Sequence, residues 1–272
     1  MEQEQHSLSS QIGDTRIMEK KKITSPSDLL KKSLEIYQQK FWKFVGMNCV
    51  PILGFLPLAI VLGLFAIATI VFQNSANTIM VSIINIILGL LGIISVLVAI
   101  YIGTISQIGL LVLLKNFSSE QKIKEAFKEA MNYFWSYVVI GAITAIFVIL
   151  WSLLFIIPGI IFAVYYSFSK YTLIFEGYKS MSALKRSKEL IKNYWWAVVG
   201  RQLFVCLILV LFVLFLSIPE LFAEKGSIAN IISQIFSNLI YLLISPIVLI
   251  YSVLIYKDLV EIKKIKVEKI EK

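Results

Sequence analysis

Three ionisable residues lie within or beside apolar runs of the chain, where charge is costly and usually serves a function: Lys170, Glu176 and Arg201. If Lys170 and Arg201 pair with Glu176, they form a cytosol-facing polar pocket whose cations suit a lipid phosphate. The alternative is that both long basic side chains extend to the lipid headgroups at the membrane surface. The sequence leaves both interpretations open.

The chain has no grouping of residues that is typical of catalysis or metal binding. Its single histidine, His6, lies in a polar N-terminal segment, and its two cysteines, Cys49 and Cys206, lie inside apolar runs. Their spacing matches neither a zinc site nor a disulfide framework. The sequence also has no paired carboxylates and no phosphate-binding glycine loop in a setting that would support catalysis. We therefore expect a protein that is not an enzyme and needs no cofactor or metal.

The composition indicates a membrane protein. Of the 272 residues, 58% are hydrophobic and only 16% are charged, and the mean hydropathy is +0.82. These values exceed those of ordinary soluble proteins. A net charge of +9 could suggest nucleic-acid binding, but the basic residues lie beside the apolar runs. That distribution favours anionic lipids as partners and argues against nucleic acid.

The apolar runs predict an all-α fold, a polytopic transmembrane helical bundle with about six spans in three hairpins. The predicted spans are residues 45–72, 95–114, 138–155, 160–175, 197–217 and 228–256. The run from 79 to 114 is too long for one span, so we expect an interfacial or protruding turn at about 79–90, with two spans as the alternative. Pro158 and Gly159 predict the tight turn between the third and fourth spans.

An amphipathic interfacial helix is expected before each hairpin, starting near residues 25, 116 and 180. When Trp42, Trp135 and Trp196 are aligned, their apolar and basic neighbours also align, which favours an internal repeat over three unrelated basic helices. The interfacial basic residues are Lys31, Lys32, Lys124, Lys185, Arg186 and Lys188, and the interfacial aromatic residues are Trp42, Trp135, Trp195 and Trp196.

This alignment divides the membrane domain, residues 25–256, into repeat units of about 25–115, 116–176 and 180–256. A flexible cytosolic tail is expected at 1–24 and a charged cytosolic tail at 257–272. Of the 26 lysines and arginines, 24 fall on one side of the predicted bundle, Arg201 and Lys225 being the exceptions. The positive-inside rule then predicts a multi-pass protein of the cytoplasmic (inner) membrane with both termini in the cytosol.

One set of motifs resembles an uncharacterised bacterial six-helix membrane family, related to the membrane domain of glycerophosphodiester phosphodiesterases. The residues that carry this resemblance are Pro158, Gly159, Glu176, Gly177, Ala183, Leu184, Ser187 and either Trp195 or Trp196. The catalytic phosphodiesterase domain, with its paired histidines and metal-binding carboxylates, has no counterpart here. The resemblance thus implies a six-helix fold and an association with glycerophospholipid metabolism, but no reaction.

Besides the possibility that the chain is a subunit of a larger complex, two functions follow as expectations. The first is a non-catalytic membrane protein that organises or senses lipids, or anchors a membrane or cytosolic protein partner, through its three surface helices. The second is a permease or lipid transporter in which Lys170, Glu176 and Arg201 line the pathway.

Overall fold

A computed structural model describes residues 23–72, 77–222, 224 and 226–270, with side chains described up to Lys264. The described residues form α-helices and no strands. The predicted N-terminal tail lies almost entirely outside the described residues. In chain order the helices are α2 (Pro26–Gln39), α3 (Phe41–Phe72), α4 (Thr78–Lys115), α5 (Ile123–Leu154), α6 (Ile156–Tyr166), α7 (Ser169–Glu176), α8 (Ser180–Ile191), α9 (Trp195–Phe222) and α10 (Ile228–Ile270).

Five of these helices, α3, α4, α5, α9 and α10, are long and apolar enough to cross a membrane. Their outer halves expose rows of leucine, isoleucine, valine and phenylalanine side chains. Apolar surface on this scale is unfavourable in water but is matched by lipid. The all-α, multi-pass membrane architecture expected from the composition is therefore confirmed.

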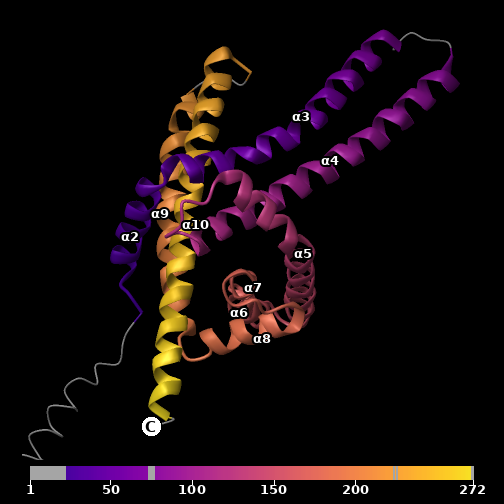
Figure 1. The fold of residues 1–272 in the computed structure, drawn as a ribbon. Helices are drawn as coiled ribbons and strands as arrows, with labels where there is room; N and C mark the ends of the chain where they lie inside the picture. The colour runs from indigo at the N-terminus through magenta and orange to yellow at the C-terminus, as the bar shows by residue number, and fades with distance from the viewer. Residues whose placement is uncertain (1–22, 73–76, 223, 225, 271–272) are drawn as a thin grey trace, which may run out of the picture.

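The α3–α4 hairpin forms a long arm that diverges from the α9–α10 hairpin (Figure 1). The predicted turn at about 79–90 is wrong, because α4 is one uninterrupted helix of 38 residues, about 57 Å long. Its start is capped by Asn77, whose side chain accepts a hydrogen bond from the Met80 amide at 3.1 Å. The following apolar run contains no proline, and its glycines lie inside the continuous helix without ending it.

The second hairpin begins and turns at positions other than those predicted. Helix α5 starts at Ile123, after Lys122, and continues through both the predicted surface helix and the predicted span. The chain reverses at Phe155, which has extended backbone angles, and Pro158 and Gly159 lie inside α6. Pro158 occupies the first turn of a helix, where its missing N–H costs nothing. The Pro-Gly pair therefore begins the returning helix and does not itself form the turn.

The predicted fourth span, 160–175, is not a single helix. It is divided at Ser167 and Phe168 into α6, with 11 residues, and α7, with 8 residues. Each piece is shorter than the roughly 20 residues that a spanning helix needs. Helix α7 then ends as predicted at Glu176-Gly177, because Gly177 adopts left-handed angles (φ +81°) that suit glycine at a helix end.

Helix α10 organises the interior of the protein. It has 43 residues and continues through the predicted boundary at 256 into the charged segment that follows. Its fully buried tyrosines, Tyr251 and Tyr256, belong to a core that also contains Leu29 of α2 and Phe168. The C-terminal half of α10 therefore joins the surface helices to the spanning helices.

Candidate functional site

Three tryptophans occupy matching positions on the outside of the protein. Trp42, Trp135 and Trp196 are 80%, 75% and 80% exposed. Each ring packs edge to face against the aromatic residue that precedes it, at centroid distances of 5.2 Å for Phe41, 5.3 Å for Phe134 and 4.6 Å for Trp195. A rigid, exposed indole with an N–H at its edge suits the polar–apolar boundary of a membrane.

The fourth predicted interfacial aromatic residue has a different place. Trp195 is half-buried, and its ring N–H donates to the carbonyl oxygen of Ile161 in α6 at 3.4 Å. It joins the start of α9 to α6, and its ring packs edge to face against that of Trp196. Trp195 therefore packs as the counterpart of Phe41 and Phe134.

The six predicted interfacial basic residues fall into three groups. Four are exposed at the surface: Lys31, Lys32, Lys124 and Lys185. Lys188 is exposed but places its ammonium group over the rings of Phe162 and Tyr165, at 5.4 and 5.9 Å. Arg186 is half-buried in an ion pair. Only the first group is fully available to a lipid surface.

The alignment of the three segments extends to their buried faces. Nine residues before each exposed tryptophan stands a small residue, Ser33, Ala126 or Ser187, and each of the three is fully buried. A small side chain allows the surface segment to approach the spanning helices closely. The three small residues align in the sequence as well, but their common role is recognisable only once the structure shows that all three are buried.

Between α2 and α3, Lys40 joins the first surface segment to the second. Its ammonium group donates to the carbonyl oxygens of Phe117 and Ser119, and it lies 4.5 Å from the centre of the Phe117 ring. Burial, followed by the positive charge of Lys43, lowers the pKa of Lys40. The 116–122 segment is thereby held against the start of α3.

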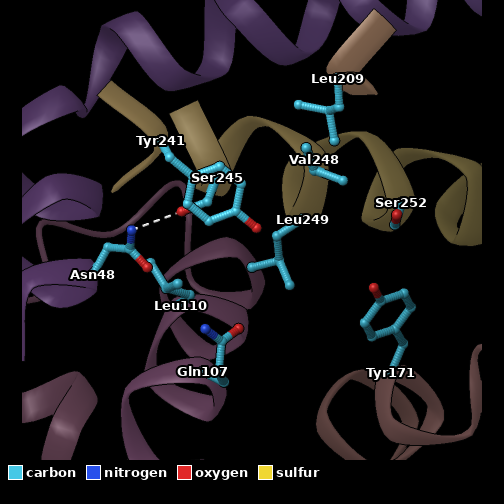
Figure 2. A pocket seen from close by; sticks show the side chains of 10 residues that line it. All are labelled: Asn48, Gln107, Leu110, Tyr171, Leu209, Tyr241, Ser245, Val248, Leu249 and Ser252. Atoms are coloured by element: carbon cyan, nitrogen blue, oxygen red, sulfur yellow. Dashed lines mark hydrogen bonds between the residues drawn. The ribbon is translucent and has the colours of Figure 1, made fainter. Parts of the chain in front are cut away.

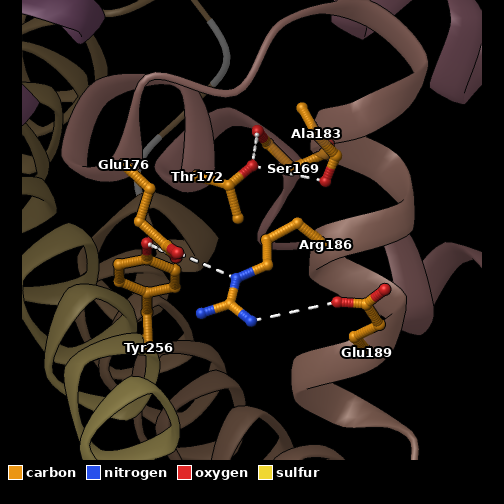
Figure 3. Close-up of polar contacts among 7 residues, drawn as sticks. All are labelled: Ser169, Thr172, Glu176, Ala183, Arg186, Glu189 and Tyr256. Carbon is orange, nitrogen blue, oxygen red and sulfur yellow. Dashed lines mark hydrogen bonds and ion pairs between the residues drawn. The ribbon is translucent and has the colours of Figure 1, made fainter. Parts of the chain in front are cut away.

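Glu176 lies at the junction of α7, α8 and α10 (Figure 3). Its carboxylate accepts from the guanidinium Nε of Arg186 at 2.8 Å and from the hydroxyl of Tyr256 at 2.5 Å. It also lines a pocket of about 310 Å³ with the charged residues Lys257, Glu261 and Lys264. Glu176 therefore borders a pocket whose other charged residues, Lys257, Glu261 and Lys264, come from α10 and are not the predicted partners Lys170 and Arg201.

Lys170 and Arg201 lie elsewhere, so the structure does not bring the three predicted pocket residues together. The Lys170 ammonium group lies 4.4 Å from the centre of the Tyr137 ring, facing α5. Six residues separate Lys170 from Glu176, which places them about 120° apart around a helix, so they face different neighbours. Among the described residues, the guanidinium of Arg201 donates to backbone carbonyls only.

Those carbonyls belong to Ala197, at 2.8 Å, and to the residues just before α2, Ile23 at 2.6 Å and Thr24 at 2.8 Å. The Thr24 amide in turn donates to the Asp258 carboxylate of α10 at 3.0 Å. The extended segment before α2 is thus held between α9 and α10. Arg201 is a structural clamp in this arrangement.

Ser187 explains the division between α6 and α7. Its hydroxyl donates to the carbonyl of Tyr165 at 2.7 Å and accepts from the amide of Phe168 at 3.2 Å. These are two of the backbone groups that the helix interruption leaves without helical partners. Next to it, the Thr172 hydroxyl lies 3.3 Å from the Ala183 carbonyl (Figure 3). The motif from Ala183 to Ser187 therefore docks α8 onto the interruption.

No family model matches the chain, and searches of curated proteins and of solved structures give no match either. The geometry described above is therefore the basis for the functional proposals that follow.

Proposed function

We propose that this is a non-catalytic protein of the bacterial cytoplasmic membrane that organises or senses anionic lipids at the cytosolic face. The observation that carries the proposal is the threefold recurrence of an exposed tryptophan held edge to face by its aromatic neighbour. Tryptophan favours the headgroup level, so three such anchors define one plane. Anchoring of a protein partner on the same surface is compatible with this role.

Lysines of the same three segments supply the attraction for anionic lipid. Lys31, Lys124 and Lys185 are all exposed and each stands eleven residues before the tryptophan of its segment. A lysine near an anionic membrane surface contributes about 1 kcal/mol of attraction. Three equivalent positions would therefore gather anionic lipid around the protein, which supports the interpretation of three repeat units.

We further infer six crossings in three hairpins, with α6 and α7 together completing the second hairpin. Three hairpins return the chain to the same side, which agrees with the positive-inside count for the termini. The resemblance to the membrane domain of glycerophosphodiester phosphodiesterases fits this arrangement and supports a role near glycerophospholipids.

The test is native mass spectrometry of the full-length protein carrying defined lipids. Phosphatidylglycerol and phosphatidylcholine with identical acyl chains are added in equal amounts to the parent and to the triple variant Lys31→Gln, Lys124→Gln and Lys185→Gln. We expect the parent to retain more phosphatidylglycerol and the variant to lose roughly tenfold or more of that preference, since about 1 kcal/mol per lysine is removed.

A charge-matched control uses three exposed lysines outside the aligned positions: Lys122→Gln, Lys179→Gln and Lys192→Gln. This control should keep most of the preference. An equal loss in both variants would mean that net charge alone attracts the lipid, and it would overturn the role of the repeated positions.

A second candidate function is lipid or solute transport through a cytosol-facing polar pocket. The pocket beside Glu176, with Lys257, Glu261 and Lys264, is the observation that favours it. Substrate-dependent uptake into liposomes containing the purified protein, lost on Glu176→Gln, would support transport. Absence of uptake for phospholipids and their water-soluble head groups would oppose it.

A further inference from the structure

A second cavity lies among the helices and shares no lining residue with the pocket beside Glu176 (Figure 2). Its volume is about 310 Å³, and residues of α3, α4, α7, α9 and α10 line it. None of the lining residues is charged. The polar ones are Asn48, Gln107, Tyr171, Tyr241, Ser245 and Ser252.

The depth of this cavity follows from Asn48. That residue stands six positions after Trp42 along α3, so it lies about 9 Å further along the helix axis. If Trp42 marks the headgroup level, the cavity lies below the phosphate groups and beside the upper parts of the acyl chains.

Several polar groups in the cavity can still form hydrogen bonds to a ligand. Both amide hydrogens of Asn48 are used, by the Leu242 carbonyl at 2.6 Å and the Ser245 hydroxyl at 2.8 Å, which leaves its oxygen as an acceptor. Within the described part of the chain, Gln107 and Tyr241 form no hydrogen bond. Polar groups at this depth need partners, because hydrocarbon supplies none.

We propose that this cavity binds the uncharged, hydroxyl-bearing head of a membrane lipid, of which diacylglycerol is the simplest example. A hydroxyl both donates and accepts, so it can pair with the Asn48 oxygen and with the Gln107 amide. A phosphate would be buried without a cation among the lining residues, which is strongly unfavourable. Leu110, Leu209 and Leu249 provide an apolar wall for the adjoining acyl chains.

This binding site differs in both place and chemistry from the anionic-lipid surface. A neutral head can enter the membrane more deeply than a charged one, because less hydration is lost. Apart from its depth, which is judged from Trp42, the binding site does not depend on the three surface segments acting on lipid.

The experiment measures retention of added lipid by the full-length protein in native mass spectrometry. The probes are dioleoylglycerol, dioleoyl phosphatidic acid, which adds only a phosphate, and free glycerol, which lacks the chains. We expect dioleoylglycerol to bind most tightly. Gln107→Leu should weaken it about tenfold by removing a two-way hydrogen-bonding group, and Tyr241→Phe should weaken it about threefold.

Two features keep the outcome interpretable. Gln107 has no partner among the described residues, so Gln107→Leu should fold normally, which thermal unfolding in detergent checks. The control is Thr104→Val on the same helix. Thr104 does not line the cavity, and its hydroxyl donates to the carbonyl of Ile100 at 2.8 Å. This variant should bind dioleoylglycerol like the parent.

Three results would overturn the proposal. Equal or tighter binding of phosphatidic acid would contradict a neutral head group. Unchanged affinity in Gln107→Leu would place the lipid elsewhere. Binding of free glycerol that displaces dioleoylglycerol would assign the cavity to a water-soluble polyol instead of a lipid.

Discussion

At the scale of single residues, Ser187 shows how a motif in the sequence acquires a physical role. It completes the hydrogen bonding of Tyr165 and Phe168 where α6 gives way to α7, and it is fully buried. A buried backbone group without a partner costs more than the hydrogen bond it has lost. Ser187 therefore stabilises an interruption that would otherwise be unfavourable.

We expect Ser187→Ala to lower the free energy of unfolding by about 1–3 kcal/mol, because two backbone groups lose their partner. Thermal unfolding of the purified protein in one detergent measures the change. The matched control is Ser33→Ala at the aligned position, where the hydroxyl donates only to Leu29 of its own helix at 2.6 Å. Ser33→Ala should cost clearly less, and equal losses would contradict the proposed role of Ser187.

Gly159 is a second residue whose importance depends on its neighbour. A Cβ at this position would lie 2.0 Å from the hydroxyl oxygen and 3.0 Å from the Cα of Ser152 in α5. Gly159→Ala should therefore separate α5 from α6 and lower the free energy of unfolding by about 1–3 kcal/mol.

Gly63→Ala in α3 is the control for this substitution, because nothing lies within 4 Å of its Cβ position. It should leave stability unchanged or raise it slightly, since alanine favours helices more than glycine does. Similar unfolding temperatures for the two variants would show that the α5–α6 contact tolerates a methyl group.

At the scale of elements, the clamp formed by Arg201 ties the start of α2 to the spanning helices. Two of its three hydrogen bonds reach backward in the sequence to Ile23 and Thr24. Because Ile23 is also buried in the core with Leu29, the segment before α2 should move as part of the bundle.

Arg201→Gln should release this segment while leaving α9 intact. Hydrogen exchange followed by mass spectrometry should then detect faster exchange for the peptide covering residues 23–29, by roughly tenfold or more for the loss of two hydrogen bonds to a charged group. Lys192→Gln, a change of the same charge at an exposed site, should leave that exchange unchanged. Unaltered exchange in Arg201→Gln would show that the hydrogen bond to Asp258 and the burial of Ile23 hold the segment in place without Arg201.

Local signals predicted the ends of several elements correctly. Helix α2 starts close to residue 25, as the sequence predicted, because the Ser25 hydroxyl caps it by accepting from the Asp28 amide at 3.2 Å and proline occupies its first turn. Gly177 likewise ends α7. The α6–α7 interruption was missed because no proline or glycine marks Ser167 or Phe168. Its stabilising partner, Ser187, lies 19 residues from Phe168 and meets it only in the folded chain.

At the scale of the whole molecule, the number of crossings decides where the termini lie. If α6 and α7 together cross the membrane, the N-terminus and C-terminus face the same side. If they do not, five crossings place the termini on opposite sides. The basic residues on both terminal segments favour the first arrangement under the positive-inside rule.

We expect reporter fusions to place residue 1, the α7–α8 connection near Lys179 and residue 272 all in the cytosol. Each position is fused to two reporters in turn, one active only in the cytosol and one active only outside it, so that either location gives a positive signal. A C-terminus on the opposite side from the N-terminus would contradict six crossings. It would leave the second hairpin without its returning crossing and would place α8 on the other side of the membrane from α2.

The sequence by itself determined the class of the protein and its repeated surface residues. Hydropathy, the lysine distribution and the aligned tryptophans are properties of short segments and of their composition, so they do not depend on a particular packing. Exposure of Trp42, Trp135 and Trp196 agrees with the same local pattern, because tryptophan favours a membrane boundary.

Only the tertiary structure decided which charged and polar groups meet. Arg186 was expected at the lipid surface but pairs with Glu176. Lys170 and Arg201, which one of the two open interpretations placed beside Glu176, face Tyr137 and the segment before α2. Hydrogen bonds and ion pairs act over a few ångströms, so partners distant in sequence are selected by the way the helices pack. Hydropathy can place each such residue near a membrane surface, but it carries no information about which neighbour lies within that distance.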